Sequence, residues 1–257
     1  MSPGERWLVR LEPRPNPSLR LVIFPPAGAG AAICFPWSRQ VPEDVEVWAA
    51  RLPGRESRIA EPLEQRMDVV VSQLAAATLR LLDRPFVLLG HSLGALLAYL
   101  VALNLKRASD VNPALLVVSG REAPNRPDNF TSIAEAPDRD FIAAIQALGG
   151  LPDHALEPEL LRLWLPALRA DFRLCASFAA MQTEPLACPV VAWRGLRDPT
   201  TTPEGVREWR AATTSWFQDR TADGDHFFPF DARTGFLETA IADIRTAQRT
   251  AAGPGLR

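Results

Sequence analysis

The stretch at residues 86–94 reads FVLLGHSLG and decides the fold of this chain. Its first half is a short apolar run typical of a buried strand, and the helical pattern at 93–105 that follows is apolar nearly all round. Strand, Gly-x-Ser-x-Gly and helix in this order place Ser92 on a sharp turn with its hydroxyl exposed above a sheet. Gly90 and Gly94 have no Cβ, so that strand and helix can approach closely. We therefore expect a nucleophilic serine at position 92.

The rest of the chain alternates predicted strands with predicted helices. Apolar or β-branched runs bounded by Gly and Pro predict strands at 19–24, 45–52, 86–89, 115–119, 190–193 and 216–220. Helical patterns lie at 67–82, 93–105 and 236–247. This alternation predicts an α/β fold, with a mostly parallel central sheet, right-handed crossovers and helices on both faces.

One connection is longer than a crossover needs. Residues 121–188 separate two predicted strands and carry helical patterns at 140–148 and 158–181, the second interrupted by Pro166. Packing on the sheet accounts for about half of its apolar side chains, and a lid over an apolar pocket accounts for the rest. We expect one domain, residues 1–257, with a lid insertion at about 130–182, and we expect substrate contacts from this lid at Leu160, Leu161 and Phe178.

A serine nucleophile needs a base, and the chain has three histidines. His91 precedes Ser92 on the turn and should point away from it, as a packing residue. His154 lies inside the predicted lid, where a histidine is most often a surface residue. His226 follows the strand predicted at 216–220, which is where this fold places the base, because the chain order is Ser, acid, His.

The acid that orients the base should follow a strand between the nucleophile and the base. Asp198 stands at that place, after the strand predicted at 190–193. Asp225 is adjacent to His226, but neighbours on a loop rarely turn their side chains toward each other, so we expect it to cap or solvate the loop. Asp198 is therefore the predicted acid, which holds the imidazole tautomer and stabilises the imidazolium.

Acyl transfer also needs backbone amides that bind the oxyanion. One should belong to the residue after the nucleophile, Leu93, and the other to a loop after an early strand. In the loop FPPAGAG, Pro25 and Pro26 have no N–H, so the first possible donor is Ala27. This glycine-rich loop lacks the lysine and the spacing of a phosphate-binding loop.

Composition excludes several other classes of function. The 257 residues are 47% hydrophobic and 23% charged, with a net charge of −2 and no basic run, so nothing indicates nucleic-acid binding. No apolar run is long enough to span a membrane, and the first twenty residues are not a signal peptide. Three widely spaced cysteines form neither a disulfide framework nor a metal site. We expect a cytoplasmic protein.

Several motifs in one order resemble those of the type II thioesterases that accompany polyketide and nonribosomal peptide synthases, a branch of the α/β-hydrolases. The resemblance runs from about residue 19 to about residue 237, through FPPAGAG, LPGRE, GHSLGA, SGREAP, LPALRADFRL, GLRDP and GDHFF. It implies Ser92 as nucleophile, Asp198 as acid, His226 as base and the amides of Ala27 and Leu93 as oxyanion donors. One departure is Pro26, where the family usually has histidine. This residue should form part of the wall of the acyl pocket.

The resemblance also implies an activity. It is the hydrolysis of acyl thioesters on the phosphopantetheine arm of acyl or peptidyl carrier proteins, which edits or unloads an assembly line. The implied enzyme needs no metal or cofactor, and we expect a monomer. Residue spacing by itself predicts only a serine hydrolase, so a small-molecule carboxylesterase and an acyltransferase or cyclase of the same fold stay open. A catalytically idle carrier-docking protein is disfavoured by the complete set of Ser92, Asp198 and His226.

Overall fold

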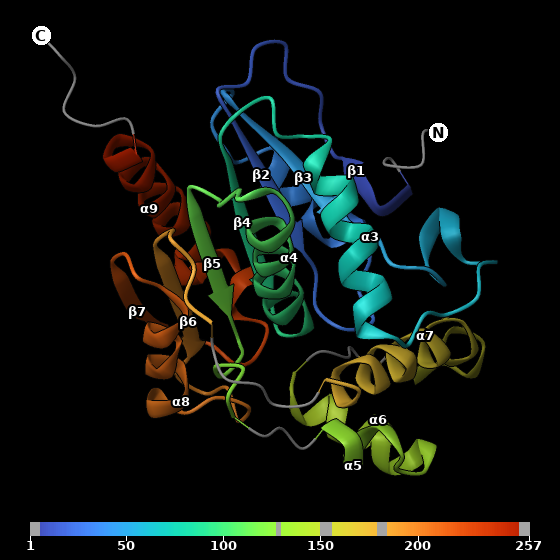
Figure 1. Ribbon diagram of the computed structural model, residues 1–257. Helices are drawn as coiled ribbons and strands as arrows, with labels where there is room; N and C mark the ends of the chain where they lie inside the picture. Colours follow the sequence, from blue (N-terminus) through green and yellow to red (C-terminus); the bar gives the residue numbers. More distant parts are fainter. Residues whose placement is uncertain (1–5, 127–129, 150–155, 179–183, 252–257) are drawn as a thin grey trace, which may run out of the picture.

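The computed structural model describes residues 6–126, 130–149, 156–178 and 184–251 (Figure 1). Its centre is a seven-stranded sheet in the order β1-β3-β2-β4-β5-β6-β7, in which only β1 is antiparallel to its neighbour. The strands are β1 Leu8–Arg10, β2 Leu19–Phe24, β3 Val45–Ala50, β4 Phe86–His91, β5 Leu115–Ser119, β6 Val190–Gly195 and β7 Phe217–Ala222. The α/β class and the six predicted strands are confirmed, and β1 is an addition.

Helices cover both faces of this sheet. Side chains of α3 and α4 share one core cluster with Val22 and Leu88 of the sheet. Side chains of α9 share the opposite cluster with Ile23 and Leu89, the next residue along each strand. The helices outside the long connection are α2 Phe35–Ser38, α3 Met67–Leu79, α4 Leu93–Ser109, α8 Pro203–Arg207 and α9 Phe236–Ala251, with short 3-10 turns at η1 Ala31–Cys34, η2 Glu56–Arg58, η4 Glu208–Ala212, η5 Phe228–Phe230 and η6 Ala232–Thr234.

Three helices lie beyond the carboxyl ends of the parallel strands, at the bottom of Figure 1. They are α5 Phe130–Ala134, α6 Asp138–Ala147 and α7 Pro158–Ala176, and all three belong to the connection between β5 and β6. We call them the α5–α7 segment. It has a small core cluster of its own, built around Phe141, Leu168 and Phe172. The carboxyl edge of a parallel sheet is where ligands bind, so this segment lies over the expected site.

The interruption predicted at Pro166 is wrong, because α7 runs through this residue without a break. Proline inside a helix removes one N–H and frees the carbonyl four residues earlier. Both Pro166 and Arg162 are exposed, so water can satisfy that carbonyl. The helix ends at Ala176, before the end predicted at residue 181, which itself lies outside the described residues.

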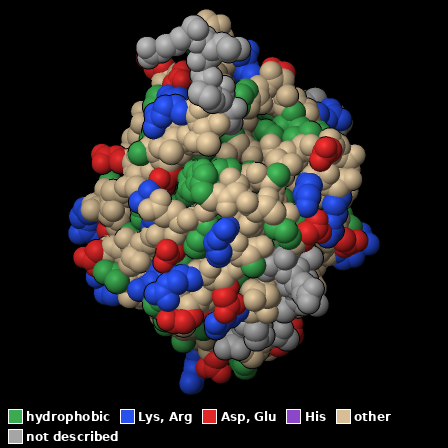
Figure 2. Space-filling view, turned by 60° about the vertical axis from the view of Figure 1, so that its left-hand side comes forward, with side chains coloured by type: hydrophobic (Ala, Val, Ile, Leu, Met, Phe, Trp, Pro, Cys, Tyr) green, Lys and Arg blue, Asp and Glu red, His purple; other side chains and the backbone are tan. Residues whose placement is uncertain are grey.

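The surface shows charges of both signs. On the described part of the face in Figure 2, basic and acidic side chains are interspersed and no broad area carries a single sign. No helix among the described residues has the length and apolar character needed to cross a membrane.

Candidate active site

The turn between β4 and α4 holds Ser92 in a strained conformation. Its φ is +55° and its ψ is −117°, a region that residues other than glycine rarely adopt. A Cβ at Gly90 would lie 2.0 Å from the carbonyl oxygen of Gly94, and one at Gly94 would lie 1.8 Å from that of Phe24. The two glycines of the motif are therefore required by close backbone contact, and the turn places Ser92 at the carboxyl edge of the sheet.

Two neighbouring loops bring the predicted acid and base together. Asp198 follows β6 and His226 follows β7, and the two loops are joined where the Arg197 amide donates to the Gly224 carbonyl at 2.9 Å. His226 Nδ1 lies 3.0 Å from Asp198 Oδ2, and both residues are buried. Since a carboxylate only accepts hydrogen bonds, Nδ1 carries the proton, and Nε2 is left as the basic nitrogen.

Sequence reasoning missed Thr200, which supports this pair. Its Oγ1 donates to Asp198 Oδ1 at 2.7 Å, its amide donates to the same oxygen at 2.9 Å, and its Oγ1 lies 3.1 Å from His226 Nδ1. Burial by itself would raise the pKa of Asp198, but the hydrogen bonds from His226 and Thr200 outweigh burial and hold the pKa below its usual value. The acid is therefore ionised at neutral pH.

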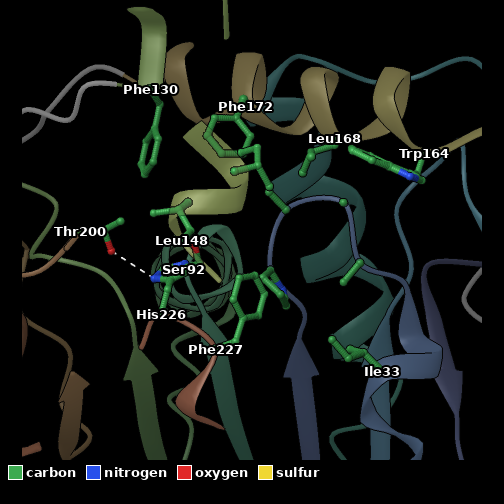
Figure 3. A pocket seen from close by; sticks show the side chains of 15 residues that line it. Ile33, Ser92, Phe130, Leu148, Trp164, Leu168, Phe172, Thr200, His226 and Phe227 are labelled. Carbon is green, nitrogen blue, oxygen red and sulfur yellow. Dashed lines mark hydrogen bonds between the residues drawn. The ribbon is translucent and has the colours of Figure 1, made fainter. Parts of the chain in front are cut away.

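A cavity of about 200 Å³ opens onto these groups (Figure 3). Ser92, His226 and Ala27 line it on the side of the sheet. The facing wall is apolar and comes mostly from the α5–α7 segment, whose lining side chains are Phe130, Ile145, Trp164, Leu168 and Phe172, with Leu148 just past α6. A reacting group at Ser92 would thus have an apolar chamber beside it for an acyl chain.

The predicted substrate contacts are only partly placed at this cavity. Pro26 lines it, but Leu160 and Leu161 do not, and Leu160 is 40% exposed. They lie at the amino end of α7, about one helical turn before the first lining residue, Trp164. The structure therefore does not place Leu160 and Leu161 at this cavity. Phe178 lines an adjoining cavity of about 290 Å³, which shares Phe130 and Thr200 with the first.

The two predicted oxyanion donors belong to separate segments, the loop after β2 and the first turn of α4. Ala27 is among the residues that line the chamber, in the loop that follows β2. Leu93 is the first residue of α4, where backbone amides have no partner within the helix and the helix dipole favours negative charge. We keep both amides as the predicted donors.

The other histidines and the second aspartate have different surroundings. His91 is 1% exposed, its Nδ1 lies 3.0 Å from Ser119 Oγ, and its ring centroid lies 4.9 Å from that of His226. Burial, and then the neighbouring His226, lower the pKa of His91 well below its usual value, so this ring packs as a neutral group. Asp225 is exposed and accepts a hydrogen bond from the Phe227 amide at 2.8 Å. His154 lies outside the described residues.

No group of three or more His, Cys, Asp or Glu side chains in the described ranges is placed to hold a metal ion. The three cysteines, all within the described residues, are buried and form no disulfide, and burial raises the pKa of Cys34 and of Cys188 to about 12. A thiolate nucleophile is disfavoured at both positions.

This chain is similar in sequence and in fold to thioesterases. A family profile described as a thioesterase domain matches residues 19–244. The gramicidin S biosynthesis protein GrsT of Aneurinibacillus migulanus is 35% identical over 95% of this chain and 96% of its own. Among solved structures, the RedJ thioesterase from the prodiginine biosynthetic pathway in Streptomyces coelicolor has a TM-score of 0.82 and 34% identity, over 92% of this chain and 95% of its own. The type II thioesterase BorB from the borrelidin biosynthetic cluster has a TM-score of 0.85 and 29% identity, over 93% of this chain and 98% of its own. The chain therefore belongs to the thioesterase family, as a type II thioesterase with the α/β-hydrolase fold.

Proposed function

We propose that this protein hydrolyses acyl thioesters on the phosphopantetheine arm of acyl or peptidyl carrier proteins, and so clears stalled groups from a polyketide or nonribosomal peptide assembly line. The observation that carries the proposal is that Ser92 and the Asp198–His226 pair meet at one apolar cavity. Relatives named for gramicidin S and prodiginine biosynthesis support the assignment to an assembly line.

The first half of the reaction forms an acyl-enzyme. Ser92 Oγ attacks the thioester carbonyl carbon while His226 Nε2 takes the hydroxyl proton. Asp198 holds the other ring nitrogen and stabilises the imidazolium that forms. The amides of Ala27 and Leu93 donate to the oxyanion of the tetrahedral intermediate. The carbon–sulfur bond then breaks, and His226 returns its proton to the departing sulfur.

The second half releases the acid. His226 removes a proton from water, and the resulting hydroxide attacks the ester carbonyl on Ser92. The carbon–oxygen bond to Ser92 breaks, the serine oxygen recovers the proton from His226, and a free carboxylic acid leaves. A thiolate leaves more readily than an alkoxide, so acylation by a thioester is the easier of the two steps.

The α5–α7 segment acts in this proposal as a lid, corresponding to the insertion expected at about 130–182 of a single domain. Its apolar side chains form the wall of the chamber that faces Ser92, and acyl chains would bind against them. The lid must move for a pantetheine arm to enter, because the same helices lie over the carboxyl edge of the sheet.

We also propose that the enzyme works as a monomer in the cytoplasm. Every group of the proposed mechanism comes from one chain, so a second copy is not needed to complete the site. Three buried cysteines that form no disulfide suit a reducing compartment.

One comparison of substrates tests the proposal against its rivals. The same acyl group is offered on a carrier protein, on pantetheine and as a simple ester, each with and without an added alcohol or amine. We expect kcat/KM to be highest for the carrier protein, and the free acid to be the product throughout. A preference for the ester would indicate a carboxylesterase, and acylated alcohol or amine would indicate an acyltransferase. Ser92→Ala serves as the blank in every arm.

A further inference from the structure

Two sequence motifs that the mechanism does not use meet inside the protein. Arg55 belongs to LPGRE and Asp171 to LPALRADFRL on α7, and 116 residues separate them. Their side chains form a bidentate ion pair, with Nη1 2.6 Å from Oδ2 and Nη2 2.8 Å from Oδ1. Arg55 is 7% exposed and Asp171 is 2% exposed. This pair joins α7 to the body of the enzyme.

The same pair holds the loop that carries the proposed oxyanion donor. Asp171 Oδ2 accepts a hydrogen bond from the Gly28 amide at 2.7 Å, one residue from Ala27. Arg55 Nη1 donates to the Ala29 carbonyl at 3.2 Å. Each partner of the ion pair therefore binds the loop: Asp171 through the Gly28 amide and Arg55 through the Ala29 carbonyl.

The helix α7 also packs closely against the loop that carries Ala27 and Gly28. Gly28 has φ +76°, and a Cβ there would lie 2.7 Å from Leu168 Cδ1, one turn before Asp171 on α7. The next residue of LPGRE, Glu56, accepts a hydrogen bond from the Ala32 amide at 2.8 Å and adopts φ +51°, which costs a residue with a Cβ about 1 kcal/mol or more. Arg55 and Glu56 thus both bind the chain just after Gly28, at Ala29 and at Ala32.

We infer that Arg55 and Asp171 are positioning residues that hold α7 and the Ala27 loop together, so that the proposed oxyanion amide is in place only while α7 is seated. This inference rests on the proposed function. When α7 moves away to open the lid, the Asp171 bond to Gly28 must break, and the loop loses its support. The pair would thus couple closure of the acyl chamber to stabilisation of the transition state, and its loss should lower kcat more than it raises KM.

The test compares Asp171→Asn with the wild type. Asparagine keeps the shape but directs an N–H toward Arg55, so that the bidentate pair is lost. With an acyl-pantetheine, we expect kcat to fall roughly tenfold or more, because complete removal of one oxyanion donor costs a hundredfold or more, and KM to change less than twofold. A fluorophosphonate probe, which places its phosphoryl oxygen where the oxyanion forms, should label Ser92 more slowly by a similar factor.

A remote ion pair gives the matched control. Arg220 Nε lies 2.9 Å from Asp243 Oδ2, between β7 and α9, and Asp243 is 6% exposed. Asp243→Asn should lower the melting temperature with unchanged kcat and labelling rate. If Asp171→Asn also lowers only the melting temperature, the Arg55–Asp171 pair stabilises the fold without positioning the oxyanion amide, and the inference is overturned.

A second variant covers the case in which Asp171→Asn does not fold. Arg55→Met with Asp171→Leu replaces the buried pair by apolar side chains, which often preserves stability. We expect this double variant to fold, but to have the same low kcat and slow probe labelling as Asp171→Asn. A kcat and a labelling rate equal to those of the wild type would overturn the inference. The labelling arm needs no thioester. If the wild type reacts with the probe but hydrolyses no thioester, the proposed function fails while the inference is still read from the labelling rates.

Discussion

Replacing Thr200 with valine removes two polar contacts from the proposed catalytic pair and leaves the shape of the side chain almost unchanged. The hydroxyl donates to Asp198 Oδ1 at 2.7 Å and lies 3.1 Å from His226 Nδ1. The backbone amide of residue 200 stays in place, so Asp198 keeps its bond from that amide at 2.9 Å and its contact with His226 at 3.0 Å. The change therefore tests the hydroxyl alone.

The magnitude follows from the charge of the acceptor. A hydrogen bond to an ionised group contributes about 1.5 to 3 kcal/mol. A tenfold change in rate corresponds to about 1.4 kcal/mol, so kcat/KM should fall by about tenfold to a hundredfold if the transition state uses this bond in full. The loss also raises the pKa of Asp198 toward its usual value, since Thr200 is one of the groups that lower it. A carboxyl with a lowered pKa stabilises the fold above its unfolded pKa, and that contribution is lost as the pH falls. In Thr200→Val this contribution should be smaller, and as the pH falls it should be fully lost at a higher pH than in the wild type.

The assay is the release of free thiol from an acyl-pantetheine, followed from pH 5 to pH 9. Thr200→Ser should recover most of the activity because it restores the hydroxyl. The neighbouring Thr201 is the matched control, since its buried Oγ1 has no hydrogen-bond partner within the described residues, and Thr201→Val should keep wild-type kcat/KM. A kcat/KM of Thr200→Val within twofold of the wild-type value would refute the reasoning.

Tryptophan at Phe172, which lines the acyl cavity, should depress kcat/KM for long acyl-pantetheines selectively, whereas tryptophan at Leu160 should not. Equal loss at every chain length would count against a chamber bounded by α7. Burial lowers the pKa of His91 in the folded protein, so the unfolded chain takes up this proton more readily, and the free energy of unfolding should fall through this group as the pH drops from 7 to 5. The free energy of unfolding, measured with urea, should therefore depend less on pH in His91→Asn than in the wild type. The same pH dependence in both proteins would contradict this prediction. Asp198→Asn should reduce kcat by several orders of magnitude and Asp225→Asn by less than about twofold, as measured by thiol release. The opposite ranking would move the acid to position 225.

Strands β2 to β6 could be predicted from sequence because they are largely buried on both faces and read as mostly apolar runs. The edge strand β7 is largely exposed. The strand that sequence reasoning missed is β1, a three-residue edge strand with the burial pattern buried, intermediate, exposed. So short a run, between charged and proline-rich neighbours, carries no periodic signal. The proposed nucleophile, acid and base could be named because each follows a strand in a fixed order.

The lining of the acyl cavity could not be predicted in this way. Leu160, Leu161 and Trp164 all belong to the apolar pattern of α7, and only the packing of that helix over the sheet decides which of them faces Ser92. The support from Thr200 is a local turn whose pattern, Asp-x-Thr, is too common to be a signal. The Arg55–Asp171 pair joins distant segments, and charge by itself does not select one partner among many.

The most direct test of the central claim, that Ser92 is the nucleophile of a thioesterase acting on carrier proteins, is an intact-mass measurement on an acylated carrier protein. Incubation with the wild type should convert the acyl carrier to its free-thiol form with release of the acid. Incubation with Ser92→Ala, shown by circular dichroism to be folded, should leave the acyl mass unchanged over the same time. Conversion of the carrier by Ser92→Ala at a rate near that of the wild type would contradict the account.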